Sequence, residues 1–111
     1  MFQDSQVVSN RGRDALEVWF EPWGMPHPLA PGESLRVVGQ SPHAGQLEVD
    51  ASGGTVAVYA WVGATLRVYQ AEALIHDFSG AVPELPPGMS TRSFVEQMFG
   101  GAGGKGGEPG G

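Results

Sequence analysis

The stretch QLEVDASGGTVAVYAWV, residues 46–62, carries the strongest fold signal in the sequence. On both sides of Gly53-Gly54, apolar residues alternate with other residues, which is the pattern of half-buried β-strands. Two adjacent glycines can adopt the positive φ angles that a tight two-residue hairpin turn requires. A turn at these glycines places Ala51 opposite Val56 and brings the apolar faces of both strands to the same side. The stretch therefore predicts an antiparallel hairpin.

The same alternation recurs in four other segments, which are separated by glycine and proline residues. These segments are ALEVWFE, SLRVVG, TLRVYQ and ALIHDF, residues 15–21, 34–39, 65–70 and 73–78. A three-residue loop over residues 62–64 is expected to join the hairpin to the segment 65–70, with Tyr59 opposite Arg67. About six short strands in this order predict an all-β fold, either a small antiparallel β-sandwich or a partly open barrel.

One short helix is expected near the C-terminus, after the proline-stiffened connector PELPPG. Ser90 or Thr91 can cap its first turn, and Phe94 and Met98 are spaced to form an apolar stripe that needs a surface to dock on. Beyond it, GGAGGKGGEPGG holds eight glycines in twelve residues, a composition typical of a flexible tail. The predicted organisation is an N-terminal arm (1–14), a β-sandwich domain (15–80), the connector and helix (81–99) and a disordered glycine-rich tail (100–111).

The composition limits the classes of function. The chain has 111 residues, enough for one domain with a modest core. It contains no cysteine, which excludes disulfides, thiolate metal sites and thiol catalysis. Twelve acidic residues against six basic ones give a formal charge of -6, which opposes binding to nucleic acid. Neither a signal peptide nor a membrane span of roughly 20 apolar residues is recognised, so we expect a cytoplasmic protein that does not bind membranes.

Four aromatic residues fall on strand positions opposite the expected core: Trp19, Tyr59, Trp61 and Tyr69. One interpretation is that this face is also buried, under the C-terminal helix or under the loop over residues 23–31. The other interpretation is a contact surface for a partner protein or a second copy. A sugar-binding platform with Glu17, Glu48 and Arg67 at its rim is a further alternative, although the spacing of these residues is not specific for sugars.

The segment EPWGMPHPLAPGE, residues 21–33, follows the first predicted strand. Pro22 should end that strand, because proline cannot donate to a central ladder. The later prolines restrict the backbone and favour an extended corner along which Trp23 and Leu29 pack. The alternative is a binding loop that uses Trp23 together with His27.

The three histidines, His27, His43 and His76, match no paired histidine motif. His27 and His43 lie in proline-containing loops that could share one end of a sandwich, where Asp77 or Glu33 could complete a metal site. Histidines that are exposed or packed in loops are the favoured interpretation. We therefore expect no cofactor, and His27 and His43 stay weak metal candidates.

The segments LEVWFEPWG, LAPGESLRVVG and VAVYAWVGATLRVY together resemble a set of small uncharacterised bacterial proteins. In these proteins an E-P-W segment, a P-G-E strand start and a tryptophan-containing hairpin recur. The resemblance covers residues 16–69 and implies no activity. The P-G-E start and the short strands are also similar to cupredoxin-like sandwiches. Those proteins hold copper with a cysteine thiolate, which this chain lacks, so the similarity implies a copper-free variant.

No catalytic residue is predicted, because the sequence has no G-x-S-x-G, no phosphate-binding loop and no dinucleotide-binding glycine pattern. The leading hypothesis is a non-enzymatic binding or assembly module that contacts a protein partner or a second copy through the aromatic face, the C-terminal helix or both. The residues predicted to make these contacts are Trp19, Trp23, Tyr59, Trp61, Arg67, Tyr69, Phe94 and Met98. The alternatives are a sandwich that binds a small ligand, a carbohydrate or a metal through its histidine and proline loops, and an enzyme of unknown class.

Overall fold

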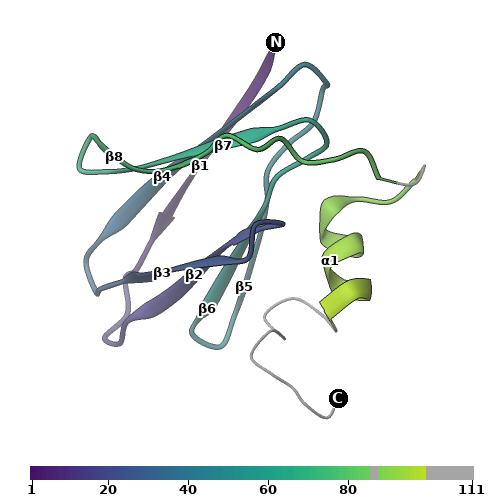
Figure 1. Ribbon diagram of the computed structural model, residues 1–111. Helices are drawn as coiled ribbons and strands as arrows, with labels where there is room; N and C mark the ends of the chain where they lie inside the picture. Colours follow the sequence, from purple (N-terminus) through teal and green to yellow (C-terminus); the bar gives the residue numbers. More distant parts are fainter. Residues whose placement is uncertain (86–87, 100–111) are drawn as a thin grey trace.

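The computed structural model describes residues 1–85 and 88–99, which form two four-stranded β-sheets that face each other and one helix (Figure 1). The elements in chain order are β1 (Phe2–Ser9), β2 (Leu16–Glu21), β3 (Met25–Leu29), β4 (Ser34–Ser41), β5 (Glu48–Ser52), β6 (Thr55–Tyr59), β7 (Thr65–Gln70), β8 (Ala73–Phe78) and α1 (Thr91–Phe99). The strand order is β1-β4-β7-β8 in the first sheet and β3-β2-β6-β5 in the second sheet. The predicted all-β class and the C-terminal helix are confirmed.

The core lies between the two sheets. Every second residue of the central strands points inward, so these strands contribute almost fully buried side chains. Examples are Val18 and Phe20 of β2, Val58 of β6, and Leu66 and Val68 of β7. The alternation in the sequence therefore identifies the inner faces correctly, because burial of apolar surface is the main force that orients the strands.

The central hairpin has the predicted register. β5 and β6 pair antiparallel with Ala51 opposite Val56, and the chain turns at Gly53 and Gly54. Their φ angles are 50° and 86°, which only glycine adopts without strain. The prediction from the sequence is confirmed at this turn.

The predicted pairing of the next two strands is wrong. β7 does not pair with β6, because residues 60–64 carry the chain from the second sheet to the first. Tyr59 lies opposite Glu21 of β2 in a parallel pair, whereas Arg67 lies opposite Val38 of β4. The alternation shows which residues point inward but does not show which sheet a strand joins, so a crossover between sheets has the same pattern as a hairpin.

The structure has eight strands rather than six, and the two additional strands lie at sheet edges. Residues 1–14, expected as an arm, include β1, which pairs with β4. Only Val8 of this strand is buried, so its alternation is too weak to be recognised. β3, in the expected proline corner, pairs with β2 although it contains Pro26 and Pro28. An edge strand tolerates proline because one of its sides has no ladder to donate to.

Helix α1 begins after Ser90, one of the two predicted caps. The backbone N–H of Ser93 donates to the Ser90 Oγ at 3.1 Å, as an N-cap side chain requires. Figure 1 shows α1 beside the second sheet, on the side of β5 and β6. Within the described ranges no helix is long and apolar enough to cross a membrane. The predicted flexible tail, residues 100–111, lies outside the described residues.

Candidate functional site

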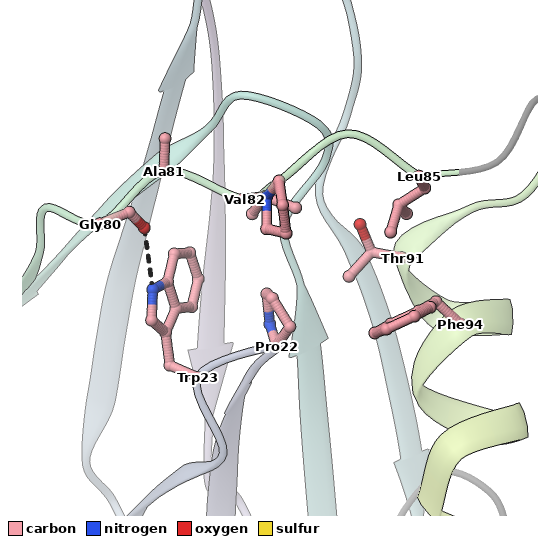
Figure 2. A pocket seen from close by; sticks show the side chains of 9 residues that line it. Pro22, Trp23, Gly80, Ala81, Val82, Leu85, Thr91 and Phe94 are labelled. Carbon is pink, nitrogen blue, oxygen red and sulfur yellow. Dashed lines mark hydrogen bonds between the residues drawn. The ribbon is translucent and has the colours of Figure 1, made fainter.

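A cavity of about 440 Å³ opens where three segments meet: the turn after β2, the connector after β8 and the first turn of α1 (Figure 2). We call it the Trp23 cavity. Its lining is Pro22, Trp23, Gly80, Ala81, Val82, Pro83, Leu85, Thr91 and Phe94. Most of this lining is apolar, and the volume lies in the range of roughly 300–1,000 Å³ that is usual for ligand pockets.

Trp23 is fixed in the wall of the cavity by two contacts. Its indole N–H donates to the carbonyl of Gly80 at 3.0 Å, as the dashed line in Figure 2 shows. Its ring stacks on Phe78 of β8, with 5.1 Å between the centroids and 23° between the planes. These contacts join the β2–β3 turn of the second sheet to the end of β8 in the first sheet. The indole is therefore held in one orientation before anything binds.

The connector that forms the roof of the cavity is also anchored. Val82 is buried, and its backbone N–H donates to the carbonyl of Ala64 at 3.0 Å. The N–H of Gly63 in turn donates to the carbonyl of Val82 at 2.9 Å. The crossover between β6 and β7 thus holds the connector in place.

The cavity wall contains one unsatisfied hydroxyl group. Thr91 is 5% exposed, and its Oγ1 has no hydrogen-bond partner among the described residues. Figure 2 shows this oxygen pointing from the helix toward the connector. A buried hydroxyl without a partner costs about 1–3 kcal/mol. The surrounding atoms cover this oxygen, so the surface that the cavity offers to an occupant is mainly apolar.

Part of the outer face of the second sheet is covered by α1. Val95 is fully buried and packs with Phe94 against Ala57 and Tyr59 of β6. Burial, and next the charge of the buried Glu21, raise the pKa of Tyr59 to about 12. This part of the predicted aromatic face is therefore closed to a partner.

Arg92 of α1 forms ion pairs with β5. Its guanidinium lies 3.3 Å from the Asp50 carboxylate and 3.9 Å from that of Glu48, and it also bonds Glu96 one turn along at 3.1 Å. The hydrogen bond to Glu96, followed by the charge of Asp50, raises the pKa of Arg92. The helix thus rests on the sheet through a small apolar contact and an ionic contact. Met98, predicted to complete the apolar stripe, is 62% exposed.

The predicted aromatic residues do not form one surface. Trp19 lies half-buried on the outer face of the second sheet, and its indole N–H donates to Glu17 at 2.9 Å. Trp61 belongs to the core, where it packs so closely against Gly39 and Gly45 that neither position has room for a Cβ. The proposed sugar-binding rim is likewise divided, because Arg67 belongs to the first sheet and Glu17 and Glu48 to the second.

Tyr69 and Arg67 lie on the outer face of the first sheet, around a hollow of about 180 Å³. We call this surface the arginine face; its lining is Gln3, Arg36, Val38, Gln40, Thr65, Arg67 and Tyr69. The guanidinium carbon of Arg36 lies 4.4 Å from the centroid of the Tyr69 ring, which orients Arg36 by a cation–π contact. Arg67 makes a long ion pair of 3.9 Å with Asp77 of β8.

The fold brings together His27 and His76, a pair that the sequence did not indicate. The Nδ1 of His27 and the Nε2 of His76 are 3.1 Å apart. Burial, and next the proximity of His27, lower the pKa of His76. His43, the expected neighbour of His27, is exposed in the loop between β4 and β5, where its ring borders Gly63.

The sequence predicts that Trp23 and Phe94 contact a partner, but it does not indicate that they line a common cavity. The connector was interpreted as a spacer, and residues 80–85 carry no pattern that shows where they pack. A glycine before Ala81 and a proline after Val82 were the one available signal that the backbone of this segment follows a defined course.

Comparison with known proteins found no matching family model, no matching curated protein and no matching solved structure. The resemblance to small bacterial proteins and the similarity to cupredoxin-like sandwiches therefore stay predictions.

Proposed function

We propose that this chain is a non-catalytic binding module that holds an apolar side chain of a partner protein in the Trp23 cavity. The observation that carries the proposal is the cavity itself. An apolar pocket of about 440 Å³ is built from three separate segments of the chain.

The composition of the cavity supports a protein as the occupant. Aromatic side chains are enriched in the centres of protein interfaces, and Trp23 and Phe94 supply two here. A short segment of a partner protein can place one apolar side chain in this cavity, between Trp23 and Phe94.

The rigidity of the lining supports the proposal further. Trp23 is bonded to Gly80, and Val82 is bonded to Ala64, so the walls belong to anchored segments. A site that is ordered before binding loses less conformational entropy when a partner arrives.

A photo-crosslinking experiment in the cells that produce the protein tests the proposal. Glu84 is exposed between two lining residues, so a benzoylphenylalanine at this position reaches the rim without disturbing the core. Val7 on β1 is 65% exposed on the first sheet and provides the matched control position. We expect one protein to be captured from position 84 and not from position 7, and Leu85→Glu to abolish that adduct.

Two outcomes contradict the proposal. The first is capture of the same proteins from both positions, or an adduct that Leu85→Glu leaves unchanged. The second is a bound small molecule, seen by native mass spectrometry of the full chain and lost in Leu85→Glu, since it would make the cavity a small-ligand site.

The arginine face supports a second candidate function, the binding of a small anionic ligand such as a carboxylate-bearing sugar. Arg36 and Arg67 place two guanidinium groups around one hollow in a chain of net charge -6. Guanidinium groups bind carboxylates with two parallel hydrogen bonds, and the Tyr69 contact already orients Arg36. An NMR titration with glucuronate, with glucose as the control, should shift the signals of β4 and β7 only for glucuronate. Arg36→Gln should remove the effect, and equal shifts with glucose would refute this candidate.

A further inference from the structure

We infer that His27 and His76 form a two-histidine site for a divalent transition-metal ion of the Zn²⁺, Cu²⁺ and Ni²⁺ class. Neither histidine lines the Trp23 cavity, although Phe78 packs against both His76 and Trp23, and the inference does not depend on the proposed partner.

Both histidines lie on strands at the same open side of the sandwich. β3 is an edge strand of the second sheet and β8 is an edge strand of the first, and Figure 1 shows them on the same side. His27 lies opposite Val18 and His76 opposite Val68, and both valines point into the core. Directly opposed residues share a face, so both imidazoles lie in the gap between the two sheets.

The separation of the two nitrogens fits a shared metal ion. Histidine nitrogens bind Zn²⁺ at about 2.0–2.1 Å, so two ligands at 90–110° lie about 2.9–3.4 Å apart. The observed 3.1 Å between His27 Nδ1 and His76 Nε2 falls inside this range. An ion at about 2.0–2.1 Å from both nitrogens lies roughly 40° off the line that joins them, so binding requires loss of the shared proton and a rotation of the rings.

Neighbouring rings hold His76 in place. Its imidazole stacks on Phe78, with centroids 5.7 Å apart and planes 19° apart, and it lies 5.9 Å from the ring of Phe20. His27 approaches it edge-on at 85°. This packing limits the conformations of one ligand before metal arrives, which favours binding.

The site has open positions. Within the described part of the chain, no group of three or more His, Cys, Asp and Glu side chains could hold a metal ion. Two imidazoles favour borderline metals over Mg²⁺, and water would fill the remaining positions. A metal bound here would link β3 to β8 across the gap between the sheets.

The test is thermal unfolding of the full chain after removal of metals, with Zn²⁺, Ni²⁺, Cu²⁺ or Mg²⁺ added singly. A ligand that binds only the folded state raises Tm. We expect a saturable rise of several degrees with the three transition metals and none with Mg²⁺. The rise should disappear in His27→Gln and in His76→Gln and persist in His43→Gln, the matched control.

An NMR measurement on the unmodified protein keeps the inference testable if a variant fails to fold. Substoichiometric Cu²⁺ is paramagnetic and should broaden first the signals of His27, His76 and Phe78. The inference is overturned if no transition metal raises Tm. It is also overturned if the rise survives both His27→Gln and His76→Gln, or if broadening is centred on His43 or the N-terminus.

Discussion

The two tyrosines of the chain lie on the outer faces of opposite sheets, and their surroundings differ. Tyr59 is 1% exposed, because Val95 and Phe94 of α1 cover it. Tyr69 is only half-buried and lies beneath the guanidinium of Arg36. Both tyrosines come from strands with the same alternation. Whether an outer-face aromatic residue is buried or open therefore depends on a distant segment, here the first turns of α1.

The largest expected effect is a difference in the free energy of unfolding between variants of the two tyrosines. Tyr59→Ala should lower the free energy of unfolding by about 3 kcal/mol, because it leaves a space between α1 and β6. Tyr69→Ala should cost less than about 1 kcal/mol, since it removes one contact at a partly exposed site. Urea denaturation of both variants measures the difference. Equal losses would show that the two faces do not differ as the structure indicates.

The second prediction concerns the helix that creates the difference. Val95→Asp should cost about 2–3 kcal/mol, because it places a charge at a fully buried contact and releases α1 from the sheet. Met98→Asp, on the same helix at a position that is 62% exposed, should change stability by less than about 0.5 kcal/mol. Guanidinium denaturation with tryptophan fluorescence compares the two variants. Similar costs would mean that α1 is not docked through Val95.

The third prediction uses the raised pKa of Tyr59. The folded state holds the phenol proton up to a pKa of about 12, whereas the pKa of an unperturbed tyrosine is 10.0. Between these values the unfolded chain binds fewer protons, so stability falls as pH rises. The loss should be roughly 1 kcal/mol at pH 11 and should be absent in Tyr59→Phe. Unfolding midpoints at pH 9 and pH 11 provide the measurement, and an identical loss in Tyr59→Phe would remove Tyr59 as its source.

The smallest effect concerns the ionic contact of the helix. Arg92→Ala should lower the free energy of unfolding only slightly at low salt, because its ion pairs with Asp50, Glu48 and Glu96 are partly exposed. High salt should reduce this cost by screening the charges. Denaturation at two salt concentrations checks the prediction. A cost that salt leaves unchanged would assign the contribution of Arg92 to packing.

Part of the fold could be predicted from local signals. The turn at Gly53-Gly54 was predicted with its register, because two adjacent glycines both favour the turn and fix the pairing. The inner faces of the central strands were predicted from alternation. The partner of β6 was not, since pairing with β2 depends on how two whole sheets stack. β3 was missed because its prolines predict a corner, and only its edge position makes a strand compatible with them.

The candidate sites, like the fold, could be predicted only in part from local signals. Trp23 was predicted to be a binding residue from its type and its loop, and that prediction stays untested. The Trp23 cavity also requires the connector, which comes from a different part of the chain and has no local signal. The sequence likewise suggested His27 with His43, both in proline loops, whereas the stacking of the sheets placed His27 against His76. Local sequence patterns could not predict these contacts, because the contacts join segments that are far apart in the chain.

We propose that the docked helix completes a cavity that binds a partner protein. Crosslinking from benzoylphenylalanine at position 84, compared between Val95→Asp and Met98→Asp, tests this claim most directly. NMR signals of β4 and β7 verify that the sheets stay folded in both proteins. We predict that the partner adduct is lost in Val95→Asp and retained in Met98→Asp. An adduct of equal yield in both variants would contradict the claim.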